Sequence, residues 1–383
     1  MWTRRAHDGA AVAGGSGSED GAKAGIRHRW RQLGLVGLAL VACEDSGPEL
    51  PPIALETDRA RIALDEHYER DPPCHGDLDH IDEQVARVEE LLGVERPEPV
   101  SIFLGVGGVD DFCSDPENQL ACYRHDLDWI FGPWQALDHE LVHAVARDIQ
   151  FPSLFWSEGT AEMLSRATQK SLTSVLTPDL FAATELINYV TPAHFSRFVV
   201  ETYGWDAFNR IIRGESIEDV LGMSALEATQ RYEEEAPYSY PRLDPCPYAP
   251  LASVGEGRWQ ETVAFTCESP DASSFEFLGG STEWGPVLLR SLELEAGDYE
   301  FEFDGVLAYR FVLLGCLTEQ LDVEPEPPSN GDLYNEAEGA GTEFPAVGRH
   351  TLTVTDGTYR IALVGAYAAP ADATATFTVT RVE

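Results

Sequence analysis

Residues 134–147 have the sequence WQALDHELVHAVAR, and this stretch decides how the first half of the chain is organised. Its apolar residues recur at helical spacing, so we expect one helix here. Helical spacing places His139 and His143 one turn apart on the same face, where two imidazoles can bind one metal ion. Glu140 projects from the same turn, and its carboxylate can take a proton from an attacking water. Two histidines hydrogen-bonded within a helix are the less favoured alternative.

A second helix-forming segment supplies the remaining ligand. Catalytic zinc takes three protein ligands and leaves a fourth position for water. After Pro152 the chain reads WSEGTAE, and we expect Glu158 to open a second helix as the third ligand, with Gly159 keeping its approach to the first helix close. Glu162 follows one turn later and is expected to hydrogen-bond the far nitrogen of a ligand histidine. The alternative is that both glutamates are solvated charges at a helix start.

The two motifs HELVH and WSEGTAE resemble those of the gluzincin metallopeptidases, in which a glutamate on the next helix is the third zinc ligand. The resemblance covers about residues 53–235 and implies a zincin-like α+β domain. It also implies one Zn²⁺ ion bound by His139, His143 and Glu158, with Glu140 as the general base. The 14 residues between the second histidine and the ligand glutamate are fewer than in the best-known gluzincins. The G-A-M-E-N element of the exopeptidases is absent, which disfavours an aminopeptidase.

Peptide-bond hydrolysis needs a donor for the carbonyl oxygen, which gains negative charge during the reaction. Tyr189, His194 and Tyr203 all follow the second helix and carry an O–H or N–H group. We favour Tyr189 as the catalytic donor, although such residues are more often core aromatics or hydrogen-bonded histidines. Residues 126–131 (DLDWIF) precede the motif helix and can pair with an extended peptide as an added strand.

The N-terminal part predicts export. Residues 33–42 (LGLVGLALVA) are apolar but make up only about half of the ~20 residues that a membrane-spanning helix needs. Three arginines precede this run and LVAC ends it, an order typical of a secretion signal. Because LVAC resembles a bacterial lipobox, we predict that residues 1–42 are removed and that Cys43 carries lipid. Residues 43–52 are then a proline-rich tether. An ordinary signal peptide is the alternative.

The net charge of the chain restricts the molecules that it can bind, and its cysteines indicate the compartment in which it is found. The chain carries 66 acidic and 26 basic residues, a net charge of -40, which excludes nucleic acid and leaves the lipid anchor as the only membrane contact. Six cysteines follow the proposed lipidation site, and an even number in an exported chain favours disulfides over metal binding. Cys113 and Cys122 flank a short polar loop and are the preferred pair. The other pairings stay open.

The second half of the chain has a different pattern. A Pro- and Tyr-rich stretch, residues 235–250 (EAPYSYPRLDPCPYAP), interrupts regular structure. We therefore predict a metallopeptidase domain at 53–240 and a second domain at 250–383. In the latter, apolar and polar residues alternate between Gly-Asp and Asp-Gly turns, which predicts an all-β sandwich. It contains no calcium-loop motif. The domain is similar to the C-terminal β-sandwiches of secreted bacterial peptidases, and a role in substrate attachment follows from that analogy alone.

These observations predict a lipid-anchored zinc metalloendopeptidase of the bacterial cell envelope, acting on a peptide or protein substrate. One alternative is a non-catalytic surface lipoprotein that binds a protein or glycan partner. Another is a structural lipoprotein in which a fourth protein ligand, His194, closes the metal site.

Overall fold

The computed structural model describes residues 50–382 with gaps at 71, 106–111, 114–119, 167, 172–173, 186–187, 241, 244–247, 270, 274–285, 305–307, 316–341, 346–347 and 366–373. All described residues fall within one compact unit, Pro48–Glu383. The predicted leader and the lipidation site at Cys43 lie outside the described residues, as do Cys246 and Cys316.

The first part of the described chain is built on a five-stranded sheet with the order β1-β2-β3-β5-β4. Its strands are β1 (Leu55–Glu56), β2 (Ala60–Leu64), β3 (Val100–Leu104), β4 (Cys122–Arg124) and β5 (Trp129–Gly132). Strands β2, β3 and β5 are parallel, and β4 is antiparallel to β5. Helix α2 (His75–Leu92) lies between β2 and β3 in the chain and completes a β-α-β unit.

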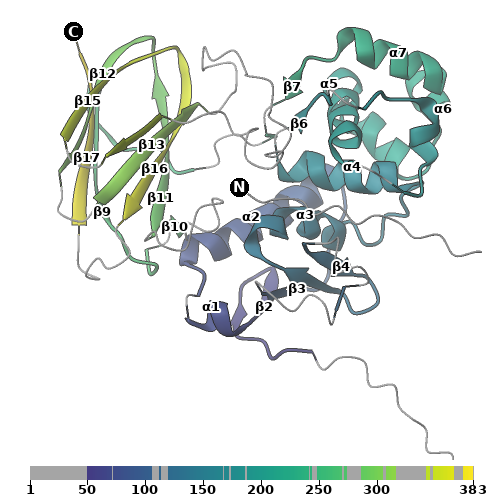
Figure 1. Ribbon diagram of the computed structural model, residues 1–383, viewed down its shortest axis with the longest axis horizontal. Helices are drawn as coiled ribbons and strands as arrows, with labels where there is room; N and C mark the ends of the chain where they lie inside the picture. Colours follow the sequence, from purple (N-terminus) through teal and green to yellow (C-terminus); the bar gives the residue numbers. More distant parts are fainter. Residues whose placement is uncertain are drawn as a thin grey trace, which may run out of the picture. The chain divides into compact units, whose positions relative to one another are not determined.

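Each face of this sheet has its own apolar contacts. Ile62, Ile102 and Ile130 are neighbours in register and are almost fully buried in a core that α2 and α3 (Trp134–Val145) share. Residues one position along a strand point the other way, and Phe103 and Phe131 accordingly pack in a separate cluster. Figure 1 shows α2 and α3 beside these strands. The sheet is therefore the support of the helix that carries both histidines.

The structure corrects one expectation about the sheet. Residues 126–131 were expected to offer a free strand edge to a peptide, but β5 lies between β3 and β4 and is hydrogen-bonded on both sides. The edge position belongs to β4. This strand is only three residues long and reads CYR, so it has too little apolar alternation to be recognised from the sequence.

A helical region follows the sheet and completes the surroundings of α3. Its elements are α4 (Leu154–Ser165), the 3-10 helix η2 (Pro178–Ala182), α5 (Val190–Ile212), α6 (Ile217–Leu221) and α7 (Ala225–Glu235), and α1 (Glu66–Arg70) precedes α2. Two short strands, β6 (Thr168–Gln169) and β7 (Ser239–Tyr240), pair with each other. Helix α5 consists of two helical segments that meet in a kink at Gly204, whose φ of 85° is a left-handed conformation that glycine adopts without strain.

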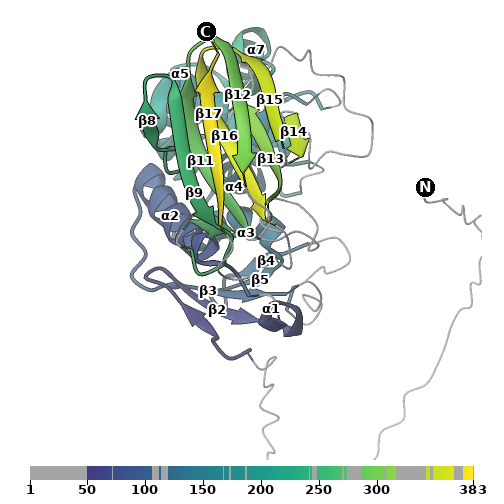
Figure 2. The same cartoon turned by 90° about the vertical axis from the view of Figure 1, so that its left-hand side faces the viewer.

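The last part of the described chain consists of two five-stranded antiparallel sheets, with the orders β10-β11-β16-β13-β14 and β15-β12-β17-β9-β8 (Figures 1 and 2). Leu292 and Ile361 of the first sheet and Phe301 and Phe377 of the second belong to one buried core. The chain is thus a mixed α+β protein, and its two sheets with a common core are compatible with the predicted sandwich. The strands are β8 (Ser253–Gly255), β9 (Arg258–Ala264), β10 (Ala272–Ser273), β11 (Val287–Leu294), β12 (Gly297–Asp304), β13 (Ala308–Gly315), β14 (Thr342–Pro345), β15 (Gly348–Val354), β16 (Gly357–Gly365) and β17 (Thr374–Arg381).

Two disulfides lie within the described residues. Cys113 and Cys122 are bonded, which confirms the predicted pair. A second bond joins Cys74, just before α2, to Cys267, just after β9, so it connects the two parts of the fold covalently. Such bonds persist in oxidising compartments and indicate an exported protein. None of the described helices has the length and apolar character that crossing a bilayer requires.

The two disulfides are expected to differ in their contribution to stability. Cys74 and Cys267 are 193 residues apart in sequence, and Cys113 and Cys122 are 9 apart. Because a longer closed loop removes more entropy from the unfolded chain, replacing the first pair by alanine should lower the free energy of unfolding by about 5 kcal/mol, against about 3 kcal/mol for the second. Urea unfolding of both double variants measures this difference. Equal losses would contradict the entropic explanation.

Candidate metal centre

Helix α3 places the residues of the first motif in a mostly buried environment. Leu137, Leu141 and Ala144 pack into the core, with at most 1% of each residue exposed. His139 is 9% exposed and Glu140 is 8% exposed, which is unusual for polar groups. Burying such groups is costly unless they are hydrogen-bonded or bind an ion, so their surroundings indicate a function.

Helix α4 supplies the carboxylates, and its packing differs from the sequence interpretation. Glu158 was expected to open the helix, but α4 begins at Leu154 and Glu158 lies in its second turn. Gly159 was expected to face the first helix. It faces α5 instead, where an added Cβ would lie 2.8 Å from the carbonyl oxygen of Pro192. A larger residue at this position would push α4 away from α5 and displace the glutamate beside it.

The three expected metal ligands converge. Nε2 of His139 lies 3.2 Å from Nε2 of His143 and 3.1 Å from Oε2 of Glu158. Nε2 of His143 lies 3.4 Å from the same carboxylate oxygen. These residues form a group that can hold a metal ion, with one nitrogen or oxygen atom from each. Among the described residues, no further histidine, cysteine, aspartate or glutamate joins this group.

The size of this triangle fits a small, four-coordinate cation. Zinc bonds to nitrogen and oxygen ligands are ~2.0–2.2 Å long, so neighbouring ligand atoms of a regular tetrahedron lie ~3.3–3.6 Å apart. The three observed separations are 3.1, 3.2 and 3.4 Å, close to that range. Calcium needs six to eight oxygen ligands at longer distances, which two imidazoles and one carboxylate do not supply. The donor set therefore suits a transition metal.

The outer ring nitrogens of both histidines also have partners. Oε2 of Glu162 lies 3.2 Å from Nδ1 of His139, in the position expected for an orienting carboxylate, and its other oxygen lies 3.1 Å from Nε of Arg166. The sequence interpretation missed Ser157, whose hydroxyl lies 3.5 Å from Nδ1 of His143. In the sequence, the indication of this contact was that Ser157 directly precedes Glu158. Such contacts fix the tautomer and the orientation of a ligating ring.

The charges of the group are strongly coupled. Burial is the largest effect on His139 and disfavours its charged form, but hydrogen bonds to Glu158 and Glu162 and the nearby charge of Glu140 outweigh it and raise the pKa of His139 to about 10. Burial likewise opposes ionisation of Glu158, and its contacts with the two histidines outweigh that effect and lower its pKa. The surroundings thus favour a positive charge at the centre of the group.

Glu140 has no partner of this kind. The residue as a whole is 8% exposed, and no hydrogen bond or ion pair engages its carboxylate among the described residues. An unengaged carboxylate beside a group that can hold a metal ion is available to accept a proton.

The three candidate donors for the carbonyl oxygen are placed differently. Tyr189 precedes α5, is 44% exposed, and its ring stacks on His139 with centroids 5.8 Å apart. His194 is fully buried, with Nδ1 3.0 Å from the hydroxyl of Tyr232. The hydroxyl of Tyr203 accepts a hydrogen bond of 2.8 Å from Arg231. Of the three, the structure brings only Tyr189 to the metal group, and His194 is not part of that group.

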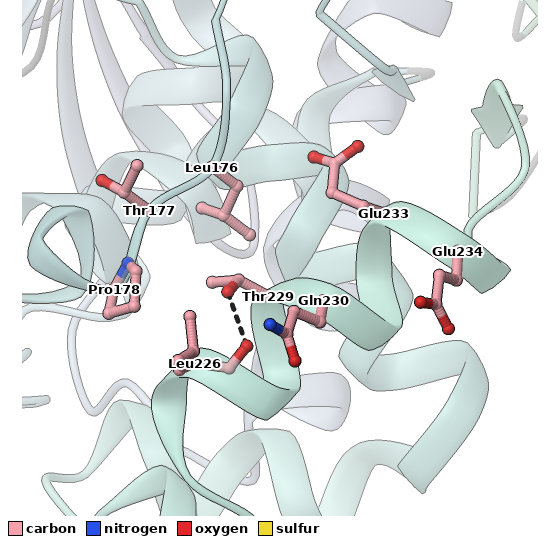
Figure 3. A pocket seen from close by; sticks show the side chains of 8 residues that line it. All are labelled: Leu176, Thr177, Pro178, Leu226, Thr229, Gln230, Glu233 and Glu234. Carbon is pink, nitrogen blue, oxygen red and sulfur yellow. Dashed lines mark hydrogen bonds between the residues drawn. The ribbon is translucent and has the colours of Figure 1, made fainter.

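A pocket of about 330 Å³ lies elsewhere, between α7 and the segment that enters η2 (Figure 3). The hydroxyl of Thr229 in its wall donates a 2.8 Å hydrogen bond to the carbonyl of Leu226. None of the metal-binding residues lines this pocket. The lining residues are Leu176, Thr177, Pro178, Leu226, Thr229, Gln230, Glu233 and Glu234.

Comparison of the chain with models of known protein families gave no match, and comparison with curated proteins gave none either. The chemistry of the metal group is what indicates a function for this chain.

The environment of His194 predicts a pH dependence of stability. Burial, followed by the charge of Lys170, lowers the pKa of His194 to about 4. Between pH ~6.5 and 4 the unfolded chain binds a proton at this residue that the folded chain does not. The stabilising effect of the neutral imidazole is therefore complete above pH ~6.5 and is lost as the pH falls, by about 2 kcal/mol at pH ~4.5.

Urea unfolding of His194→Phe at these two pH values should show a correspondingly smaller pH dependence than the wild type. His125→Phe is the control, because this histidine is exposed. An unchanged pH dependence in His194→Phe would contradict the assignment of a buried neutral imidazole.

Proposed function

We propose that the protein is a zinc-dependent metalloendopeptidase of gluzincin type. The observation that carries this proposal is the triangle of three ligand atoms from His139, His143 and Glu158, 3.1 to 3.4 Å apart. Its donor set, two imidazoles and one carboxylate, is the one that catalytic zinc has in several peptidases. The H-E-x-x-H spacing and the glutamate on the next helix support the same assignment.

The residues around the triangle have distinct roles in the proposed reaction. When bound, zinc activates water and polarises the scissile carbonyl. Glu140 accepts the proton of the attacking water and passes it to the leaving amine, for which its unengaged carboxylate is suited. Glu162 orients His139 through Nδ1. Tyr189 stands at the exposed side of the ligand helix, where its hydroxyl can donate to the carbonyl oxygen of a bound peptide.

The arrangement favours a catalytic over a structural metal site. A structural zinc site is closed by a fourth protein ligand, and no fourth metal-binding side chain joins the group within the described part of the chain. His194, the residue considered for that position, contacts Tyr232 instead. The side chains of His143 and Glu158 are 17% and 16% exposed, so solvent reaches the group.

We also propose that the enzyme is held at the bacterial cell envelope by lipid on Cys43. Support comes from the LVAC sequence after an apolar run and from the disulfides, which indicate export. Its substrate is a peptide or protein. The net charge of -40 disfavours strongly acidic substrates, because like charges repel as the molecules approach.

Replacing the proposed base should separate catalysis from metal binding. We expect Glu140→Gln to keep about one zinc ion per chain but to lower the rate of peptide hydrolysis by at least ~10²–10⁴-fold, because the amide cannot accept the proton. Zinc content is measured by atomic absorption, and hydrolysis is measured with a mixture of denatured proteins and with a peptide library.

Glu234→Gln is the matched control, since it makes the same change in a residue outside the metal group. It should keep wild-type activity. Hydrolysis that survives in Glu140→Gln would refute the assignment of the base. A wild-type protein that holds zinc and cleaves no member of the library would favour the structural lipoprotein, in which the metal only stabilises the domain.

A further inference from the structure

A half-buried cluster of charges lies at the C-terminal end of α3. Asp128 ends the turn between β4 and β5, where its φ of 58° is a left-handed conformation that aspartate tolerates. Its Oδ2 accepts hydrogen bonds from Arg96 at 2.7 Å and from Arg147 at 2.5 Å. Its Oδ1 accepts one from the hydroxyl of Tyr123 at 2.7 Å. The carboxylate therefore joins the strand turn to two arginines.

Arg96 extends this cluster to the metal helix. Nη1 of Arg96 donates a 2.6 Å hydrogen bond to the carbonyl oxygen of Ala144, and Ala144 directly follows the ligand His143. The last carbonyls of a helix have no partner within the helix and carry partial negative charge, so a guanidinium there satisfies an acceptor and stabilises the helix end. One planar side chain thus bridges Asp128 and the final turn of α3.

Arg96 is buried, and burying its charge is costly unless its hydrogen-bond donors have acceptors. Only 3% of its side chain is exposed. A buried guanidinium is tolerated when its donors are used, and this one also donates from Nε to the carbonyl of Glu98 at 3.1 Å. Burial is the largest effect on Tyr123, and together with its hydrogen bond to Asp128 it raises the pKa of Tyr123 to about 12, so the phenol stays a donor. The three nitrogens of the buried Arg96 guanidinium thus each have an acceptor.

We propose that Arg96 and Asp128 are positioning residues of the metal centre, which fix the last turn of α3 and with it the ring of His143. The sheet and α4 are separate supports of the ligand triangle, and a bridge between the β4–β5 turn and the residue after His143 sets where α3 ends relative to the sheet. This role rests on the proposed metal function. It assigns no chemistry to either residue, because neither belongs to the metal group.

The test measures the binding of a metal ion instead of hydrolysis. Full-length Arg96→Met is stripped of metal and titrated with Zn²⁺ against a competing chelator, and then with Co²⁺, whose visible absorption spectrum reports ligand geometry. Loss of an outer contact typically lowers metal affinity by ~10–100-fold. We expect a loss in that range and an altered cobalt spectrum.

Arg290→Met is the matched control. Arg290 is also buried, with 8% of its side chain exposed, and it pairs with Glu261 and Asp271 in the β-sheet part of the chain. This variant should show a similar loss of stability in urea unfolding but wild-type zinc affinity and cobalt spectrum. Asp128→Asn, which keeps the size of the side chain and removes its charge, should show a smaller loss of affinity in the same direction.

The outcomes separate the two proposals. Zinc affinity of Arg96→Met within twofold of the wild type, with an unchanged cobalt spectrum, would overturn the positioning role and leave the metallopeptidase proposal standing. Equal losses in Arg96→Met and Arg290→Met would also overturn it, because the effect would then be general destabilisation. If Arg96→Met does not fold, Asp128→Asn decides by the same criteria. A wild-type protein that binds neither ion would refute the metal function itself.

Discussion

The metal centre depends on how closely α4 packs against its neighbours. His139 and His143 lie near each other because one helical turn separates them, but Glu158 comes from a different helix. Its position therefore depends on helix packing. Gly159 is decisive here, since a Cβ would lie 2.8 Å from the carbonyl oxygen of Pro192 in α5. The absence of a side chain lets α4 pack against α5 and keeps the neighbouring glutamate 3.1 Å and 3.4 Å from the two histidines.

The same centre concentrates negative charge that a bound cation would balance. Three carboxylates, those of Glu140, Glu158 and Glu162, surround two imidazoles in a mostly buried region of a protein with a net charge of -40. The raised pKa of His139 means that, without a metal, a proton supplies positive charge there. A bound divalent cation would supply more charge in the same place, and its binding would release that proton. The carboxylates thus favour metal binding, and the engaged ones also hold the rings in place.

The sequence predicted those elements whose signal is local. A short apolar run between polar segments, such as that of β3 (Val100–Leu104), is a distinctive local signal. The helix of the first motif was expected within two residues of its observed end, whereas the start of the second helix was expected at Glu158 and lies four residues earlier, at Leu154. The edge strand β4 was missed because its three residues, CYR, are too few to show a period. The helix that packs against Gly159 was predicted wrongly. A glycine in a helix indicates that another segment packs closely against it, but the sequence does not say which segment.

The sequence by itself determined the pair of histidines, the neighbouring glutamate and the residue types of the third ligand, because helical spacing fixes which side chains within one helix share a face. The tertiary structure alone decided three other features. Glu158 lies beside the two histidines. Tyr203 and His194 have partners outside the metal group. Arg96 donates a hydrogen bond to the carbonyl of the residue after His143. Each of these contacts joins segments far apart in the chain, and only the packing of complete helices and strands sets such distances.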